Sequence, residues 1–164
     1  MKEIYVLRHA KSSWDNSNLS DFERPLAERG ISDAKKMSKF LKDMNIKIDK
    51  VLCSNAIRAK ETFDLTADGF NFEIDKATYL DKLYFGDTTT IIQDLKELDE
   101  SLNNILIVGH NPTLHYLVEI LTNESINRFT TCNLATIFHD GEWVSLNSQQ
   151  CSLKSLIRPK ELNN

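Results

Sequence analysis

The chain has 164 residues, of which 41% are hydrophobic and 27% are charged, and its formal net charge is −4. This length and composition predict one globular domain over residues 1–164 and argue against disordered and fibrous classes. The acidic balance argues against a nucleic-acid partner. We see no signal peptide, and no apolar run approaches the ~20 residues that span a bilayer. We therefore expect a cytoplasmic chain without a membrane partner.

The first predicted elements are a strand and an amphipathic helix, separated by a loop. Residues 3–7 (EIYVL) form a short apolar run rich in β-branched and aromatic residues, which predicts a strand buried on both faces and ending at Arg8. Residues 18–30 are polar and contain a proline and a glycine, so we expect mostly loop there. Over residues 31–44 apolar side chains recur at helical spacing, which predicts a helix.

The same alternation of strand and helix follows in the next segment. Residues 50–54 (KVLCS) predict a second buried strand, and residues 55–65 (NAIRAKETFDL) predict a helix with Ser54 as its N-cap. A third, short strand is expected near residues 72–76 (FEIDK).

Two further helices flank the clearest strand of the chain. Isoleucines and leucines at helical spacing predict a helix over residues 88–98. Residues 104–109 (NILIVG) predict a fully buried strand, and residues 110–122 (HNPTLHYLVEILT) predict a helix with Pro112 at its start.

The pattern changes at the C-terminal end. Residues 134–146 (LATIFHDGEWVSL) predict two alternating strands joined as a hairpin across Asp140 and Gly141, and residues 150–157 predict a further strand. Repeated strand-helix alternation followed by a hairpin predicts a three-layer α/β/α fold. We expect a mainly parallel mixed sheet with antiparallel pairing at its C-terminal edge.

Basic side chains follow three of the predicted strands. Arg8 and His9 end the first strand, Arg58 lies at the start of the helix after the second, and His110 follows the strand at 104–109. Each has an ordinary explanation alone, since Arg58 fits a solvated helix position and His110 a polar strand end. In an open α/β sheet, however, these loops meet at one edge, where such a cluster is unfavourable without a bound anion. Two arginine forks predict a phosphate-like ligand.

A histidine in such a pocket can bind phosphate or attack phosphorus through a neutral ring nitrogen. Attack would make a covalent phosphoenzyme and divide hydrolysis into two steps. Fixed cations would stabilise the transferring phosphoryl group, so we expect no metal and no other cofactor.

Four motifs in sequence order resemble those of the histidine phosphatase superfamily: LRHAKSSW, DFERPLAERG, SNAIRAKET and VGHNP. The short length and the RPL element make the chain most similar to the small SixA-type phosphohistidine phosphatases. The resemblance implies that His9 is the nucleophile and that Arg8, Arg58 and His110 hold the phosphoryl oxygens. Arg24 matches a SixA-type arginine, and either lies over the pocket or pairs with Asp21 or Glu23 to fix the loop.

The sequence departs from the wider superfamily in three places. Ala10 stands where many members have glycine, and Asp15 stands near a position where larger members place a phosphate-contacting asparagine, so Asp15 faces either the leaving group or solvent. Longer members supply a general acid as a glutamate, whereas the matching region here offers only Asp81 and Asp87, of which Asp81 is the better candidate. A weak acid favours phosphoramidates, because imidazole leaves more readily than an alkoxide.

The resemblance therefore predicts a phosphatase that acts on a phosphohistidine-bearing protein. The sequence also fits two alternatives, namely a phosphatase for a small phosphorylated metabolite and a module that binds a phosphorylated partner without turnover. An Arg-His pair argues against the binding module, because recognition alone requires no nucleophile. We expect a monomer or a weak oligomer.

Overall fold

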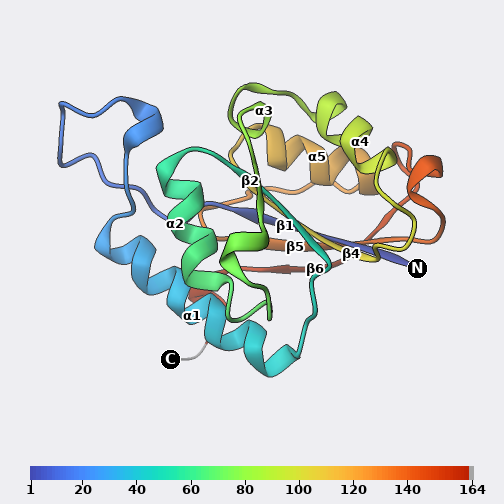
Figure 1. Ribbon diagram of the computed structural model, residues 1–164, viewed down its shortest axis with the longest axis horizontal. Helices are drawn as coiled ribbons and strands as arrows, with labels where there is room; N and C mark the ends of the chain where they lie inside the picture. The colour runs from blue at the N-terminus through green and yellow to red at the C-terminus, as the bar shows by residue number, and fades with distance from the viewer. Residues whose placement is uncertain (163–164) are drawn as a thin grey trace.

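A computed structural model describes residues 1–162 as a six-stranded sheet in the order β3-β2-β4-β1-β5-β6 (Figure 1). The strands are β1 (Lys2–Arg8), β2 (Lys50–Ser54), β3 (Thr78–Leu80), β4 (Asn104–Gly109), β5 (Leu134–His139) and β6 (Ser152–Ile157). β1, β2, β3 and β4 run parallel, β5 is antiparallel to β1, and β6 is antiparallel to β5. The predicted mixed sheet with a C-terminal antiparallel pair is confirmed.

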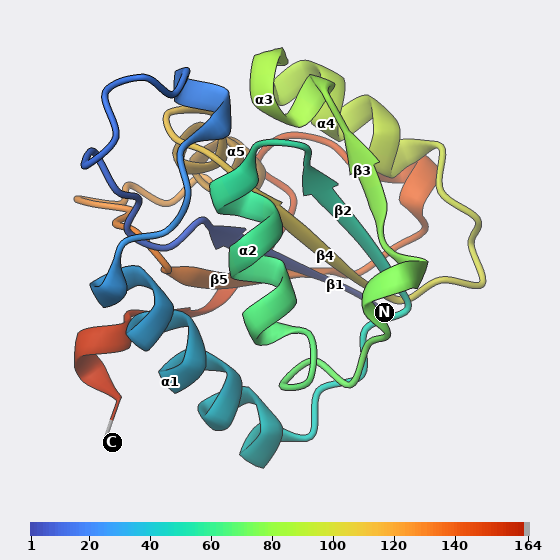
Figure 2. The same cartoon turned by 60° about the vertical axis from the view of Figure 1, so that its left-hand side comes forward.

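Helices cover both faces of the sheet, as Figures 1 and 2 show. The α-helices are α1 (Glu28–Met44), α2 (Ile57–Thr66), α3 (Lys82–Phe85), α4 (Thr88–Lys96) and α5 (Thr113–Thr122). The short 3-10 helices are η1 (Asp21–Glu23), η2 (Ile74–Lys76), η3 (Trp143–Ser145) and η4 (Pro159–Glu161). In residues 1–162 no helix is long and apolar enough to cross a membrane.

The central strands are apolar on both faces because each face contributes to a separate core. In β1, Ile4 and Val6 pack with the buried faces of α4 and α5, whereas Tyr5 and Leu7 pack with those of α1 and α2. Successive strand side chains point to opposite faces, so a continuous apolar run is what a doubly covered strand requires. Two cores hold the carboxyl ends of the parallel strands in fixed positions.

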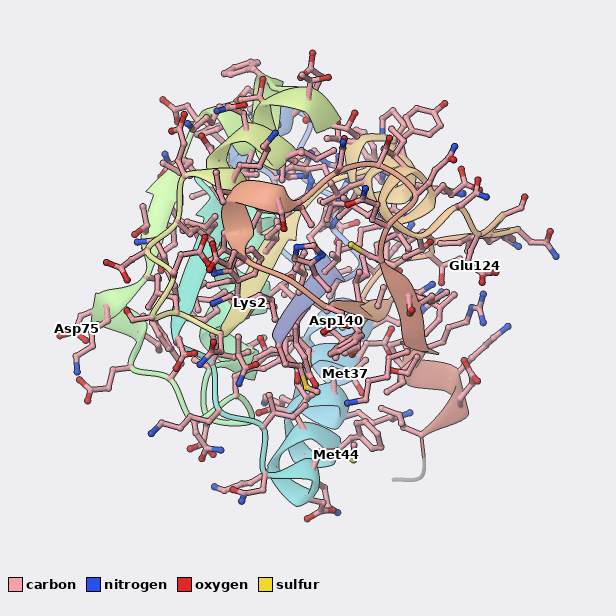
Figure 3. The ribbon with its side chains drawn as sticks, turned by 90° about the vertical axis from the view of Figure 1, so that its right-hand side faces the viewer. Lys2, Met37, Met44, Asp75, Glu124 and Asp140 are labelled. Carbon is pink, nitrogen blue, oxygen red and sulfur yellow. The ribbon has the colours of Figure 1, made fainter. Side chains whose placement is uncertain are left out.

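The predicted hairpin across Asp140 and Gly141 is wrong. The second half of that segment forms η3, and β5 pairs with β6 instead. Trp143 is fully buried, its indole Nε1 donates to the carbonyl of Leu102 at 2.7 Å, and its backbone N–H donates to Glu100 at 2.8 Å. These tertiary contacts override the local alternation. They lie at the amino end of β1, which Figure 3 faces, with Lys2 and Asp140 labelled.

Two smaller predictions are also wrong. Residues 74–76 of the expected third strand form η2, and the strand follows as β3. Ala56, not Ser54, is the N-cap of α2. The hydroxyl of Ser54 accepts a hydrogen bond from the N–H of Ala56 at 3.2 Å and lies 2.8 Å from Nε2 of His110. Pro112 does lie at the start of α5, and Asp87 caps α4 by accepting a hydrogen bond from the N–H of Thr90.

Candidate active site

Three parallel strands bring polar residues to one edge of the sheet. Arg8 at the end of β1 pairs with Gly109 at the end of β4, and β2 lies on the other side of β4. His9, His110 and Ser54 therefore meet at the carboxyl edge, where ligands bind in open α/β sheets. A pocket of about 250 Å³ lies there, lined by Arg8, His9, Lys11, Ser12, Trp14, Arg24, Arg58, His110, Asn111 and Thr131. The structure thus brings together the five basic residues predicted for the site.

His9 is buried and is held in one orientation. Its Nδ1 atom lies 2.7 Å from the carbonyl oxygen of Ala10, which assigns the ring proton to Nδ1 and leaves a lone pair on Nε2. Burial, together with the neighbouring His110, Arg58 and Arg8, lowers the pKa of His9 to about 3. At neutral pH the ring is therefore uncharged, as a nucleophilic imidazole must be.

His110 lies beside His9, with the ring centroids 5.1 Å apart. Its Nε2 atom is 2.8 Å from the hydroxyl oxygen of Ser54, and its buried Nδ1 atom has no hydrogen-bond partner among residues 1–162. Burial, followed by the charge of Arg58, lowers the pKa of His110 to about 4. If the Ser54 hydroxyl donates to Nε2, the Nδ1–H of His110 is a spare donor for a ligand oxygen.

Arg8 also has a donor without a partner. Its Nη1 atom donates to the carbonyl of Phe129 at 3.2 Å, whereas its buried Nε has no hydrogen-bond partner in the described part of the chain. Burial and the nearby charge of Arg58 lower the pKa of Arg8. A buried donor that lacks a partner is costly, and an anion in the pocket would satisfy both the hydrogen bond and the charge.

Asp21 fixes the orientation of Arg58. Arg58 donates from Nη1 to the carbonyl oxygen of Asp21 at 2.6 Å and from Nη2 to its carboxylate at 3.0 Å, while its Nε lies 3.4 Å from His9 Nε2. The hydroxyl of Tyr84 donates to the same carboxylate at 2.6 Å. Hydrogen bonds from Tyr84 and then from Arg24 and Arg58 hold the pKa of Asp21 well below its ordinary value. Asp21 is thus an ionised acceptor at neutral pH.

Arg24 both lines the pocket and pairs with Asp21, which were the two alternatives that the sequence left open. It lines the pocket, and its Nη1 atom also donates to the Asp21 carboxylate at 2.9 Å. Its Nε donates to the carbonyl of Ser13 at 3.0 Å, and its Nη2 donates to the hydroxyl of Ser12. The guanidinium carbon lies 3.2 Å from the ring centroid of Trp14. Arg24 therefore fixes the loop after β1 and places a cation at the pocket wall.

The carboxylates considered as general acids lie outside the pocket lining. Asp81 accepts a hydrogen bond from the side-chain amide of Asn55 at 2.8 Å and precedes α3. Asp87 caps α4, and its hydrogen bonds with Thr90 lower its pKa. Asp15 is exposed to solvent.

Sequence reasoning missed Tyr84 and underestimated Asp21. The sequence predicts Asp21 as a partner of Arg24 alone, whereas in the structure Asp21 also binds Arg58 and Tyr84. The motif DFERPL contained a usable signal, because an acid three residues before an arginine can pair with it. Tyr84 lies in the short helix α3, where no periodicity points to the site. Its ring centroid is 5.3 Å from that of His110.

The pocket therefore combines a neutral imidazole with three arginines and few compensating charges. Such a set can attack phosphorus and stabilise negative oxygens around it. Among residues 1–162, no group of three or more His, Cys, Asp or Glu side chains is placed to hold a metal ion.

Comparisons with known proteins agree with this geometry. The family model of the histidine phosphatase superfamily (branch 1) matches residues 4–103. An uncharacterized protein of Mycobacterium leprae (strain TN) is 31% identical over 94% of this chain and 100% of its own length. Phosphohistidine phosphatase SixA of Escherichia coli (strain K12) is 28% identical over 84% of this chain and 86% of its own. A solved structure of the protein histidine phosphatase SixA complexed with tungstate superposes with a TM-score of 0.86, at 28% identity, covering 98% of this chain and 99% of that one.

Proposed function

Because the chain belongs to the histidine phosphatase superfamily, we propose that it hydrolyses phosphorylated substrates through a covalent phosphohistidine formed on His9. The observation that carries the proposal is the hydrogen bond of His9 Nδ1 to the Ala10 carbonyl, which leaves Nε2 unprotonated in a pocket of cations. A neutral ring nitrogen is the nucleophile that this chemistry needs.

In the first step, the lone pair of His9 Nε2 attacks phosphorus and forms an N–P bond. The bond between phosphorus and the leaving group breaks, its electron pair goes to the leaving atom, and the leaving group takes up a proton from solvent. The Nε of Arg8, the Nδ1–H of His110 and the guanidinium of Arg58 are the donors for the phosphoryl oxygens. These cations stabilise the charge that spreads over the oxygens in the transition state.

In the second step, a water oxygen attacks the phosphorus of the phosphorylated His9. The N–P bond breaks, its electron pair returns to Nε2, inorganic phosphate leaves, and the surplus proton passes to solvent. Return of the pair is favourable because burial disfavours a charged His9 ring, whose pKa lies at about 3. The hydrogen bond to the Ala10 carbonyl holds the ring in place for the next turnover.

We place phosphohistidine on a protein as the substrate. The Asp21 carboxyl is ionised at neutral pH, and Asp81 and Asp87 do not line the pocket, so a carboxylic proton donor is lacking among the described lining residues. An alkoxide leaving group needs such a donor far more than an imidazole does. A relative that is 28% identical is itself a phosphohistidine phosphatase, which supports the same substrate class.

The test is a panel of a phosphohistidine peptide, phosphoserine and phosphotyrosine peptides and sugar phosphates, ranked by kcat/KM. We expect the phosphohistidine peptide to rank first and rapid acid-free quenching to trap phosphorus on His9.

A chelator should leave the rate unchanged, since fixed cations supply the positive charge. Vanadate or tungstate should inhibit competitively. A sugar phosphate ranking first would replace the proposal with a metabolite phosphatase, and binding without turnover would indicate a phosphoprotein-binding module.

A further inference from the structure

A second pocket, of about 300 Å³, lies between α1 and the C-terminal segment. Its lining residues, which we call the basic groove, are Arg29, Asp33, Lys36, Thr130, Thr131, Arg158, Pro159 and Lys160. Figure 2 shows the C-terminal segment, in red, beside the first turns of α1. The proposed chemistry uses none of these side chains.

The basic groove and the catalytic pocket share one lining residue. Thr131 lines both, and the segment around it is tied to the nucleophile loop, because the N–H of Cys132 donates to the carbonyls of Arg8 and His9 at 3.1 and 3.0 Å. On the other side, Gly30 packs so closely that a Cβ there would lie 2.1 Å from the carbonyl oxygen of Lys11. The start of α1 is therefore pressed against a wall of the catalytic pocket.

The charge of the basic groove is opposite to that of the chain. Four basic side chains line it against the single carboxylate of Asp33, whereas the whole chain carries a net charge of −4. Asp33 lies 3.7 Å from Arg29, and Glu161 lies 3.5 Å from Arg158. Neither Lys36 nor Lys160 forms a salt bridge with any of residues 1–162. Two cations thus remain for a partner.

The placement of these cations favours an extended ligand over a small anion. In the catalytic pocket, Arg8 and His110 each offer a buried donor that has no partner among residues 1–162. In the basic groove, the Arg29 side chain is 74% exposed, and the other cations are spread over α1 and the segment around η4. Exposed charges distributed in this way attract a surface of opposite sign and raise its association rate.

We infer that the basic groove docks an acidic surface of the phosphorylated protein substrate while its phosphorylated side chain enters the catalytic pocket. The inference rests on the proposed function in taking a phosphoprotein as the substrate. It adds that the substrate is recognised by carboxylates next to the phosphorylated residue, at rim positions that affect association more than chemistry.

A binding experiment tests the groove independently of turnover. Two fluorescent, unphosphorylated peptides are compared by anisotropy, both centred on a histidine, one flanked by glutamates and the other by lysines. We expect the acidic peptide to bind wild-type protein about tenfold more tightly at low ionic strength, with the difference lost in high salt. The double variant Lys36→Glu/Lys160→Glu should remove the preference, and Lys36→Gln/Lys160→Gln should weaken it. The matched control Lys47→Glu/Lys76→Glu, at exposed positions preceding β2 and β3, should retain it.

A turnover experiment uses the phosphorylated forms of the same peptides together with phosphoramidate. We expect Lys36→Glu/Lys160→Glu to lower kcat/KM for the acidic phosphopeptide about tenfold and to leave phosphoramidate hydrolysis unchanged. Peptide binding that does not depend on peptide charge, or that the control pair weakens equally, would overturn the basic groove as a docking site. Charge-dependent binding with no hydrolysis of any substrate would support the groove and overturn the proposed function.

Discussion

The Nδ1 atom of His9 lies 2.7 Å from the carbonyl oxygen of Ala10, the residue that follows it. The N–H of Ala10 in turn donates to the hydroxyl of Thr62 in α2 at 2.9 Å. A backbone carbonyl can only accept, so the ring proton must be on Nδ1 and the reactive lone pair on Nε2. The loop after β1 thereby fixes both the orientation and the tautomer of the ring.

Replacing His9 with alanine should abolish turnover, because the proposed reaction begins with attack by His9 Nε2 on phosphorus. We expect less than about 1% of the wild-type kcat on phosphoramidate, with no trapped phosphoenzyme, as typical for loss of a covalent nucleophile. The fold should remain intact, as judged by circular dichroism and by tungstate binding. Retention of more than a few per cent of the wild-type rate, on the scale of such losses, would remove His9 as the nucleophile.

Arg8→Ala and Arg58→Ala should each lower kcat/KM about a hundredfold or more, the usual effect of losing a donor to a transition-state charge. The Lys variants should recover only part of this loss, because an ammonium lacks the planar fork and the Nε donor of a guanidinium. The measurement is steady-state hydrolysis of phosphoramidate, with Arg29→Ala in the basic groove as the control. An unchanged rate in either catalytic variant would place that arginine outside the reaction.

Asp21 is expected to act as a positioning residue through Arg58. Asp21→Asn removes a charged acceptor from Arg58 and Tyr84, so we expect kcat to fall about tenfold or more through misplacement of the guanidinium. The Kd for tungstate should not rise, because loss of a carboxylate makes the pocket more positive. Glu23→Gln is the matched control, because among residues 1–162 the Glu23 carboxylate accepts side-chain and backbone hydrogen bonds from Ser20 alone. A rise in tungstate Kd with kcat unchanged would contradict the positioning role.

Acidification should destabilise the folded protein before the carboxylates titrate. Burial lowers the pKa of His9 to about 3 and that of His110 to about 4, from an ordinary value of 6.5. Below pH 6.5 the unfolded chain therefore binds protons that the folded chain does not, so the free energy of unfolding falls as the pH decreases toward about 4. Urea unfolding between about pH 7 and about pH 4.5 measures the slope. His9→Asn and His110→Asn should each flatten it, and a wild-type slope in both variants would refute the assignment.

Much of the parallel sheet is predictable because its strands are continuous apolar runs buried on both faces. The expected strands at 50–54 and 104–109 coincide with β2 and β4. Prediction fails where distant contacts decide the local structure. Trp143 lies in an alternating segment typical of a strand. Its hydrogen bonds to Glu100 and Leu102, which precede β4, accompany a different local structure, and residues 143–145 form η3.

In the site, too, residues at strand ends are predictable from the local pattern, whereas residues placed by distant contacts are not. Arg8 and His110 are predictable because each is at or directly after the end of a buried strand, and the topology brings strand ends together. Asp21 and Tyr84 are 63 residues apart and lie in the short helices η1 and α3, which are too short to show a periodic pattern in the sequence. Their contact depends on how two irregular segments fold over the pocket, which local propensity does not determine.

Asp81 and Asp87 are the two candidate acids for protonation of the leaving group. Asp81 is held by Asn55 and Asp87 by the first turn of α4, so neither carboxylate reaches the pocket lining in this structure. Of the two, Asp81 is the better candidate for a weak contribution, because the Asp87 carboxylate is stabilised as an anion at a helix N-terminus.

We therefore expect Asp87→Asn to leave all rates nearly unchanged and Asp81→Asn to slow phosphoserine hydrolysis by less than about tenfold. Neither variant should affect phosphohistidine hydrolysis, since imidazole needs little protonation to leave. The wild-type enzyme should prefer a phosphohistidine peptide to its phosphoserine counterpart by at least about a hundredfold, the lower range of what a positioned general acid contributes. An activated aryl phosphate, whose leaving group also needs little help, should fall between them. Similar rates on the phosphohistidine and phosphoserine peptides, with both aspartate variants fully active, would mean that another group donates the proton and that leaving-group chemistry does not set the substrate preference.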